Sequence, residues 1–118
     1  MVERFGSFVR RHRESRRSED PRYSLRQVAE RIGVEPSYLS KVERGEVAPP
    51  SEGAILRLAE DLDLDGDLLL ALGGKVPSDL KDIIRRRPRL FAQLIRELRD
   101  LPDAAVLRLV REVRDGDW

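Results

Sequence analysis

The stretch Tyr23–Gly45, YSLRQVAERIGVEPSYLSKVERG, decides the fold of this chain. It contains two runs of apolar residues spaced three and four positions apart, which places each run on one face of a helix. The first run is Leu25, Val28, Ala29 and Ile32, and the second is Tyr38, Leu39 and Val42. We therefore expect two helices of about two turns each. Helices this short need other helices to cover their apolar faces.

The ends of both helices are marked by residues suited to those positions. Ser24 and Gln27 form a capping box, so the first helix should start at Ser24. Gly33 follows its last apolar residue and should adopt the left-handed conformation that glycine tolerates. Pro36 suits the first turn of the second helix, and Gly45 should end it. The sequence thus predicts two helices joined by a tight turn.

Residues that would hold such a pair together occupy matching positions. A small residue lies where the helices would cross, glycine lies in the turn, and branched residues hold the second helix; these are Ala29, Gly33, Val34, Leu39 and Val42. Together with the run PSYLSKVERGEVAPPS, they resemble the phage repressor and Cro class of bacterial DNA-binding proteins, also called the Xre class. The resemblance covers residues 1 to about 72 and implies an all-α fold with a five-helix repressor-like helix-turn-helix domain. The alternative is an ordinary two-helix corner of an all-α domain.

The resemblance also implies an ion pair between Arg13 and Glu43. An arginine and a carboxylate shielded from water are held by bidentate hydrogen bonds, and removal of one partner costs roughly 3–5 kcal/mol when the pair is buried. The alternative is two independent surface charges.

The segment from Glu35 to Arg44 should be the recognition helix, which in this class enters the DNA major groove N-terminus first. By register, the residues expected to meet base edges are Pro36, Ser37, Ser40 and Lys41. Lys41 can donate to guanine O6 and N7, whereas serine discriminates bases weakly. Glu35 would repel phosphate unless it accepts a hydrogen bond from cytosine N4.

Phosphate contacts are expected from both helices of the pair. The Ser24 hydroxyl and the first amides of its helix form a site for an anion. The residues expected to contact phosphates are Ser24, Arg26, Tyr38 and Arg44. A solvated charged face is the alternative for Arg26 and Arg31.

Other helices should complete the domain. One is expected from Val2 to about Arg17, with Phe5, Phe8 and Val9 as its apolar stripe and His12 packed at its edge. The charged segment 17–22 should be an exposed loop, which either reaches the DNA backbone through its arginines and Arg16 or is solvated. A fourth helix should be capped by Ser51, with its buried face formed by Ala54, Ile55, Leu58, Ala59 and Leu62, and a fifth should span residues 64–72.

The chain should divide into a DNA-binding domain, residues 1–74, and a C-terminal helical segment, residues 75–118. Three short amphipathic helices are expected in that segment, at 75–87, at 89–101 and after Pro102. Their apolar faces could fold back on the first domain, pair with each other or form a dimer interface, and we favour a homodimer. The run RRRPR could contact flanking DNA, but a solvated helix end is the safer interpretation.

Composition restricts the remaining possibilities. The net charge is only +1, yet the middle of the chain, residues 51–74, is acidic and both ends are mildly basic, so a local basic face is compatible with DNA binding. Cysteine is absent and there is one histidine, which argues against disulfides, metal sites and cofactors. We expect no membrane span and a cytoplasmic location.

No pattern of residues suggests catalysis. The carboxylates lack a metal-binding or histidine-paired context, and GEVAPPSEG is a turn rather than a phosphate-binding loop. We expect a non-enzymatic, sequence-specific transcriptional regulator that represses by binding double-stranded DNA at a two-fold operator as a homodimer. The alternative is an antitoxin or immunity-type regulator whose C-terminal helices bind a toxin or are targeted by a peptidase.

Overall fold

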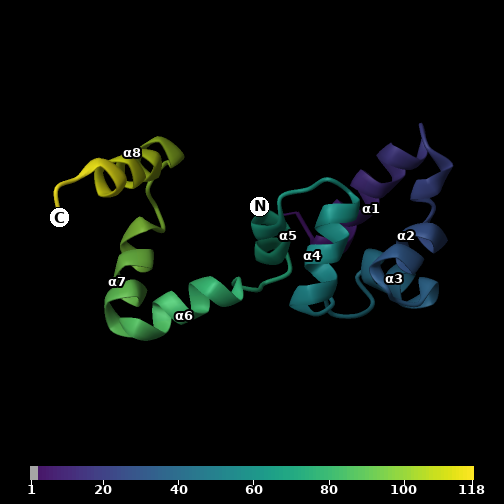
Figure 1. The fold of residues 1–118 in the computed structure, drawn as a ribbon, viewed down its shortest axis with the longest axis horizontal. Helices are drawn as coiled ribbons and strands as arrows, with labels where there is room; N and C mark the ends of the chain where they lie inside the picture. Colours follow the sequence, from purple (N-terminus) through teal and green to yellow (C-terminus); the bar gives the residue numbers. More distant parts are fainter. Residues whose placement is uncertain (1–2) are drawn as a thin grey trace. The chain divides into compact units, whose positions relative to one another are not determined.

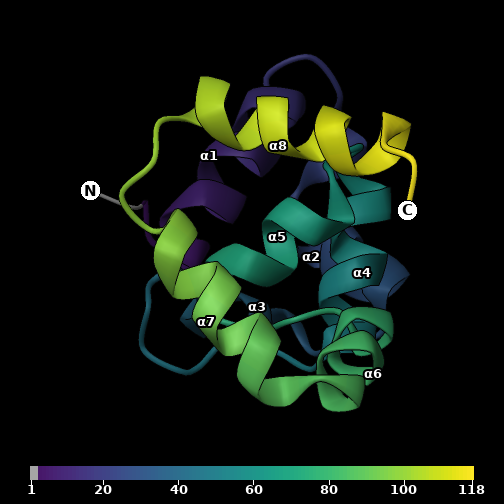
Figure 2. The ribbon, with the colours of Figure 1, turned by 90° about the vertical axis from the view of Figure 1, so that its left-hand side faces the viewer.

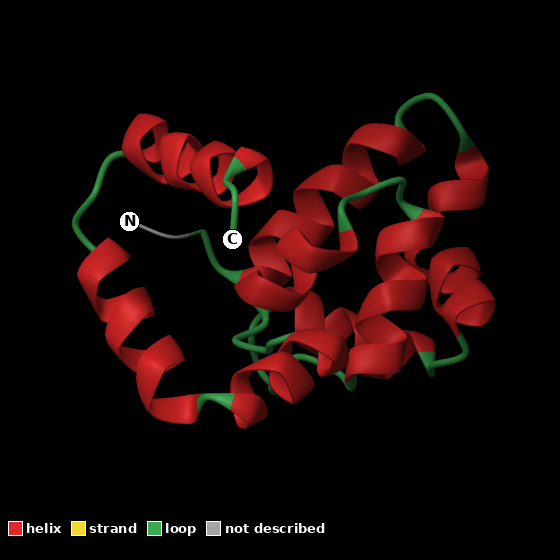
Figure 3. Ribbon diagram, turned by 60° about the vertical axis from the view of Figure 1, so that its left-hand side comes forward, coloured by secondary structure: helices red, strands yellow, loops and turns green. Residues whose placement is uncertain are grey.

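The computed structural model describes residues 3–118, and the described chain consists of helices and loops without strands (Figure 3). This confirms the all-α class. The elements are α1 (Phe5–Arg17), the 3-10 turn η1 (Pro21–Tyr23), α2 (Leu25–Ile32), α3 (Pro36–Glu43), α4 (Glu52–Asp61), α5 (Gly66–Leu72), α6 (Ser78–Arg86), α7 (Pro88–Leu98) and α8 (Asp103–Asp115) (Figure 1). The chain divides into two compact units, Met1–Pro77 and Ser78–Trp118.

The α2–turn–α3 segment has the predicted helix ends. The Ser24 hydroxyl accepts a hydrogen bond from the Gln27 amide at 3.3 Å. Gly33 has φ +79°, and the amide of Val34 donates to the carbonyl of Ala29 at 3.0 Å, which closes the C-terminus of α2. Gly45 follows α3 with φ +73°. The turn between α2 and α3 is therefore fixed by local hydrogen bonds.

The first unit has one hydrophobic core. In it α4 packs against α2 and α5, and α1 packs against α3 (Figure 1, Figure 2). Side chains from all five helices meet there, namely Phe5, Val9, Val28, Ala29, Ile32, Leu39, Val42, Ile55, Leu58, Ala59, Leu62, Leu69 and Leu70. Ser51 caps α4 through the Ala54 amide, and the expected face of α4 is buried. Together these helices position α3.

Two predictions at the start of the chain need correction. Val2, the expected start of the first helix, lies outside the described residues, and α1 begins at Phe5 because Arg4 is extended. Glu3, before the helix, accepts two hydrogen bonds from Arg11 at 2.8 and 3.2 Å. The segment 17–22, expected to be a loop, runs into η1, which begins where Asp20 accepts a hydrogen bond from the Arg22 amide.

The second unit contains the three expected C-terminal helices with shifted ends. The first begins at Ser78 rather than Lys75: the Lys75 amide still closes the end of α5 on the Leu70 carbonyl, and Pro77 disfavours helical backbone at the residue before it. The second starts one residue earlier than expected, at Pro88, and ends at Leu98 rather than Leu101. None of the residues 78–118 is buried within this unit.

Candidate nucleic-acid interface

A buried ion pair joins α1 to the end of α3. The Arg13 guanidinium donates from Nε to Glu43 Oε2 at 2.7 Å and from Nη2 to Glu43 Oε1 at 2.9 Å. The residues are only 4% and 5% exposed, so the expected pairing is present and the alternative of two surface charges is wrong. The hydrogen bonds to Glu43 raise the pKa of Arg13, and burial only partly opposes this rise.

Arg13 also reaches the segment that leads into α2. Its Nη1 donates to the carbonyl oxygen of Tyr23 at 3.2 Å. The Tyr23 ring lies beneath two further guanidinium groups, those of Arg16 at 5.5 Å and Arg31 at 5.2 Å from its centroid. These contacts fix the entry to α2 against α1, and thereby the anion site expected at Ser24.

A close backbone approach accompanies this pair. Gly6 of α1 lies against the C-terminal turn of α3, where a Cβ atom would collide with the carbonyl oxygens of Val42 and Glu43. Glycine is required there because no side chain fits. The helix α3 is therefore held at its last turn by a salt bridge and by direct contact between helix backbones.

The residues expected to read bases differ in exposure. Ser37 and Lys41, one turn apart on α3, are both exposed and point away from the core, whereas Pro36 and Ser40 are half-buried. Tyr38, expected at a phosphate, is half-buried against the core. The structure thus presents one outer face of α3, centred on Ser37 and Lys41.

The three cations expected at the DNA, Lys41 at a base and Arg26 and Arg44 at phosphates, differ in whether they have an ion-pair partner. Arg26 is exposed at the start of α2, and within the described chain neither Arg26 nor Lys41 has an ion-pair partner. Arg44 is also exposed, but its guanidinium pairs with Glu46 at 3.0 Å. An exposed pair of this kind contributes little, so Arg44 can exchange Glu46 for a phosphate at small cost.

Several arginines for which the sequence left a DNA contact open are engaged within the protein. Arg22 donates to both carboxylate oxygens of Asp20, which lowers the pKa of Asp20. Arg31 donates to Asp61 at 2.6 and 3.1 Å and so joins α2 to α4, and this contact raises the pKa of Arg31. Arg31 is thus a structural residue rather than a member of a purely solvated face.

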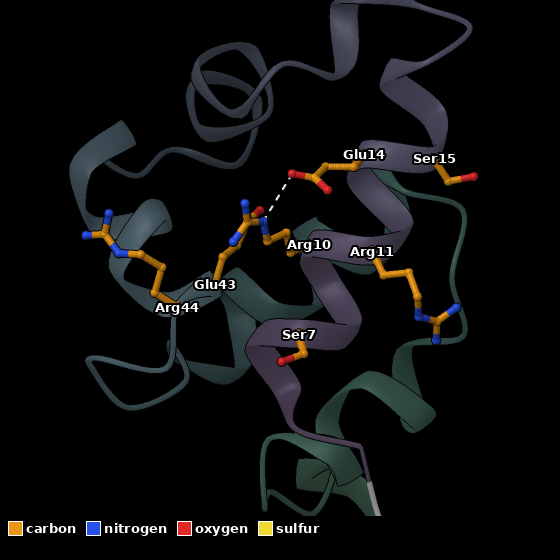
Figure 4. A pocket seen from close by; sticks show the side chains of 7 residues that line it. All are labelled: Ser7, Arg10, Arg11, Glu14, Ser15, Glu43 and Arg44. Atoms are coloured by element: carbon orange, nitrogen blue, oxygen red, sulfur yellow. Dashed lines mark hydrogen bonds and ion pairs between the residues drawn. The ribbon is translucent and has the colours of Figure 1, made fainter.

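A polar cleft beside α3 was not apparent from the sequence. Its volume is about 530 Å³, and its lining residues come from α1 and the end of α3, namely Ser7, Arg10, Arg11, Glu14, Ser15, Glu43 and Arg44 (Figure 4). The Nε of Arg10 forms an ion pair with Oε1 of Glu14 at 3.1 Å. The i, i+4 spacing of Arg10 and Glu14 could have revealed that pair, but the cleft itself depends on how α1 and α3 pack.

Two other properties of the described chain bear on the site. No group of three or more His, Cys, Asp or Glu side chains in residues 3–118 is arranged to hold a metal ion. Across the same residues, every helix is too short or too polar to cross a membrane.

Comparison with known sequences agrees with the geometry. Residues 4–72, which contain α1 to α5, match the helix-turn-helix domain family. The chain belongs to this family. Two Mycobacterium tuberculosis proteins, from strains CDC 1551 and H37Rv, are each 37% identical to this helix-turn-helix chain over 79 residues. Each is named an uncharacterized HTH-type transcriptional regulator.

The match covers 66% of this chain but only 52% of each relative, so the helix-turn-helix chain spans about half the length of the curated relatives it matches. No solved structure matches it significantly.

Proposed function

We propose that this chain is a cytoplasmic, sequence-specific DNA-binding transcriptional regulator of the phage repressor and Cro (Xre) class. It acts as a repressor and binds a two-fold operator as a homodimer. The observation that carries the proposal is the outer face of α3, where Ser37 and Lys41 are exposed on a helix whose last turn is anchored by the pair of Arg13 and Glu43. The names of the M. tuberculosis relatives support the same class of function.

Rigid anchoring suits this function. A helix of eight residues is marginal in isolation, so its orientation in a DNA groove depends on tertiary contacts. The buried pair and the contact at Gly6 supply them. In the proposed complex Lys41 donates to a base edge in the major groove, and Pro36, Ser37 and Ser40 line the same surface.

Phosphate contacts would set the register of the domain on the duplex. Arg26 lies at the capped start of α2, and Arg44 directly follows the last residue of α3. The ammonium of Lys41 and the guanidinium of Arg26 have no ion-pair partner in the described chain, so both can contact DNA without the loss of an internal ion pair. Because acidic residues dominate segment 51–74, the field of the domain is polarised, which helps to orient its encounter with DNA.

The test is selection of bound duplexes from a random double-stranded library with the full-length chain. The expected result is a two-fold symmetric consensus with half-sites about one helical turn, roughly 10 base pairs, apart. Lys41→Ala should relax the preference at one position of each half-site, whereas Lys81→Ala, which removes the same charge from α6, should not. Recovery of unselected sequences by the wild-type chain would refute the proposal.

A further inference from the structure

The apolar faces of α7 and α8 have no role in the proposed contact between α3 and DNA. Large apolar side chains of these helices are at least half exposed, namely Leu90, Leu94, Ile95, Leu107, Val110 and Val113. The large apolar residues of the first unit form a closed core, whereas no residue of 78–118 is buried. A segment of this size without a core of its own needs a partner to be stable.

The exposed apolar surface of this unit includes a groove. Between α7 and α8 lies a groove of about 430 Å³ whose lining, apart from Arg114, consists of leucine and valine. A strongly charged partner would find few ionic contacts in it. Leucine and valine side chains projecting from another helix would fill it.

A face of α8 that borders this groove, and shares Val110 and Arg114 with it, shows which helix would pack there. Asp103, Leu107, Val110 and Arg114 recur at spacings of four, three and four, the pattern of an interhelical seam. Leu107 is 59% exposed and Val110 is 52% exposed, so both are free to enter an interface. The seam is apolar at its centre, acidic at its N-terminal end and basic at its C-terminal end.

We propose that a second copy of this chain covers this face, with the two α8 helices antiparallel about a two-fold axis. In that arrangement Leu107 packs against Val110 of the partner subunit, and Asp103 lies opposite Arg114 of the partner subunit. A parallel arrangement would instead place like charges together at both ends of the seam, which is unfavourable. Charge complementarity therefore selects both a second copy and its direction.

The local contacts of Arg114 allow it to leave its neighbour and pair with Asp103 of the partner subunit. Its guanidinium pairs with the adjacent Asp115 at 3.1 Å, and both side chains are exposed. Such a pair contributes little to stability, so the guanidinium can turn to a partner carboxylate. This contact deepens the proposed function, on which it rests for the expectation of a homodimer, and it is tested without DNA so that the two can fail separately.

The first test measures the mass of the full-length chain by analytical ultracentrifugation across micromolar concentrations. The wild-type chain should be dimeric, and Leu107→Glu should raise the dimer Kd at least about a hundredfold, because two buried leucines are lost per dimer. The matched control is Leu68→Glu in α5, where the wild-type leucine is also exposed, at 46%. At concentrations where each variant is still dimeric, circular dichroism should show the helix content of the wild-type chain.

The second test exchanges charges to establish direction. Asp103→Arg and Arg114→Asp alone should each weaken the dimer on the order of tenfold, because two ion pairs become repulsive contacts, and the double variant should recover wild-type association. A monomeric wild-type chain, or a dimer indifferent to Leu107→Glu, would overturn the proposal and leave the face to the first unit of the same chain or to a different protein such as a toxin. A double variant no better than the single ones would overturn the antiparallel arrangement.

Discussion

Removal of the Glu43 carboxylate should strongly destabilise the first unit. In Glu43→Ala, the Arg13 guanidinium, 4% exposed, would lose both of its hydrogen bonds to a carboxylate and keep only the contact with the Tyr23 carbonyl. Breaking a buried ion pair in this way costs roughly 3–5 kcal/mol. A domain of this size has a free energy of unfolding of roughly 4–12 kcal/mol, so the loss is a large part of the total.

The assay is thermal unfolding followed by circular dichroism. At about 4–8 °C per kcal/mol for a domain of this size, the melting temperature should fall by roughly 12 °C or more. Glu14→Ala is the matched control, because it removes a carboxylate from an exposed pair with Arg10 and should change the melting temperature by only a few degrees. Equal shifts for the two variants would refute the claim that burial makes the Arg13–Glu43 pair important.

A companion variant separates the penalty of a stranded charge from the value of the pair. Replacing both partners with apolar residues, as in Arg13→Met with Glu43→Leu, removes the uncompensated charge and should recover much of the stability lost in Glu43→Ala. If the double variant were no more stable than Glu43→Ala, the cost would come from packing at this position and not from electrostatics.

Three other predictions concern α3, its anchoring and the second unit. Lys41→Ala or Arg44→Ala should weaken binding to the selected operator in a gel-shift assay without changing the melting temperature, and unchanged affinity would contradict the proposed docking. Gly6→Ala should lower the melting temperature sharply, because its Cβ meets backbone oxygens that cannot move aside, whereas Gly53→Ala, whose Cβ meets only the end of a flexible arginine side chain at 3.3 Å, should be neutral or stabilising. Deletion of residues 78–118 should leave a folded monomer by light scattering, and a truncated chain that still dimerises would move the interface into the first unit.

Local sequence signals were sufficient for the helix-turn-helix but not for its supports. Ser24 and Gly33 mark helix ends through hydrogen bonds that span only a few residues, so their positions could be predicted. The contact between Arg31 and Asp61 joins residues 30 positions apart, and neither residue type distinguishes it from a solvated charge. The requirement for Gly6 depends on the distance between two helix backbones, which no local pattern encodes.

The two units obtain their stability in different ways, and this has a consequence for regulation. The first unit encloses its own core and a buried ion pair, so its α3 face is formed in a single chain. In a single chain the second unit buries none of the residues 78–118. Its folding should therefore depend on the proposed dimerisation, and so on the concentration of the chain. Two half-sites can be bound together only when that pairing holds, so operator occupancy should rise with the square of chain concentration in the monomeric range. Leu107→Glu should reduce this dependence to first order while leaving the binding of a single half-site intact.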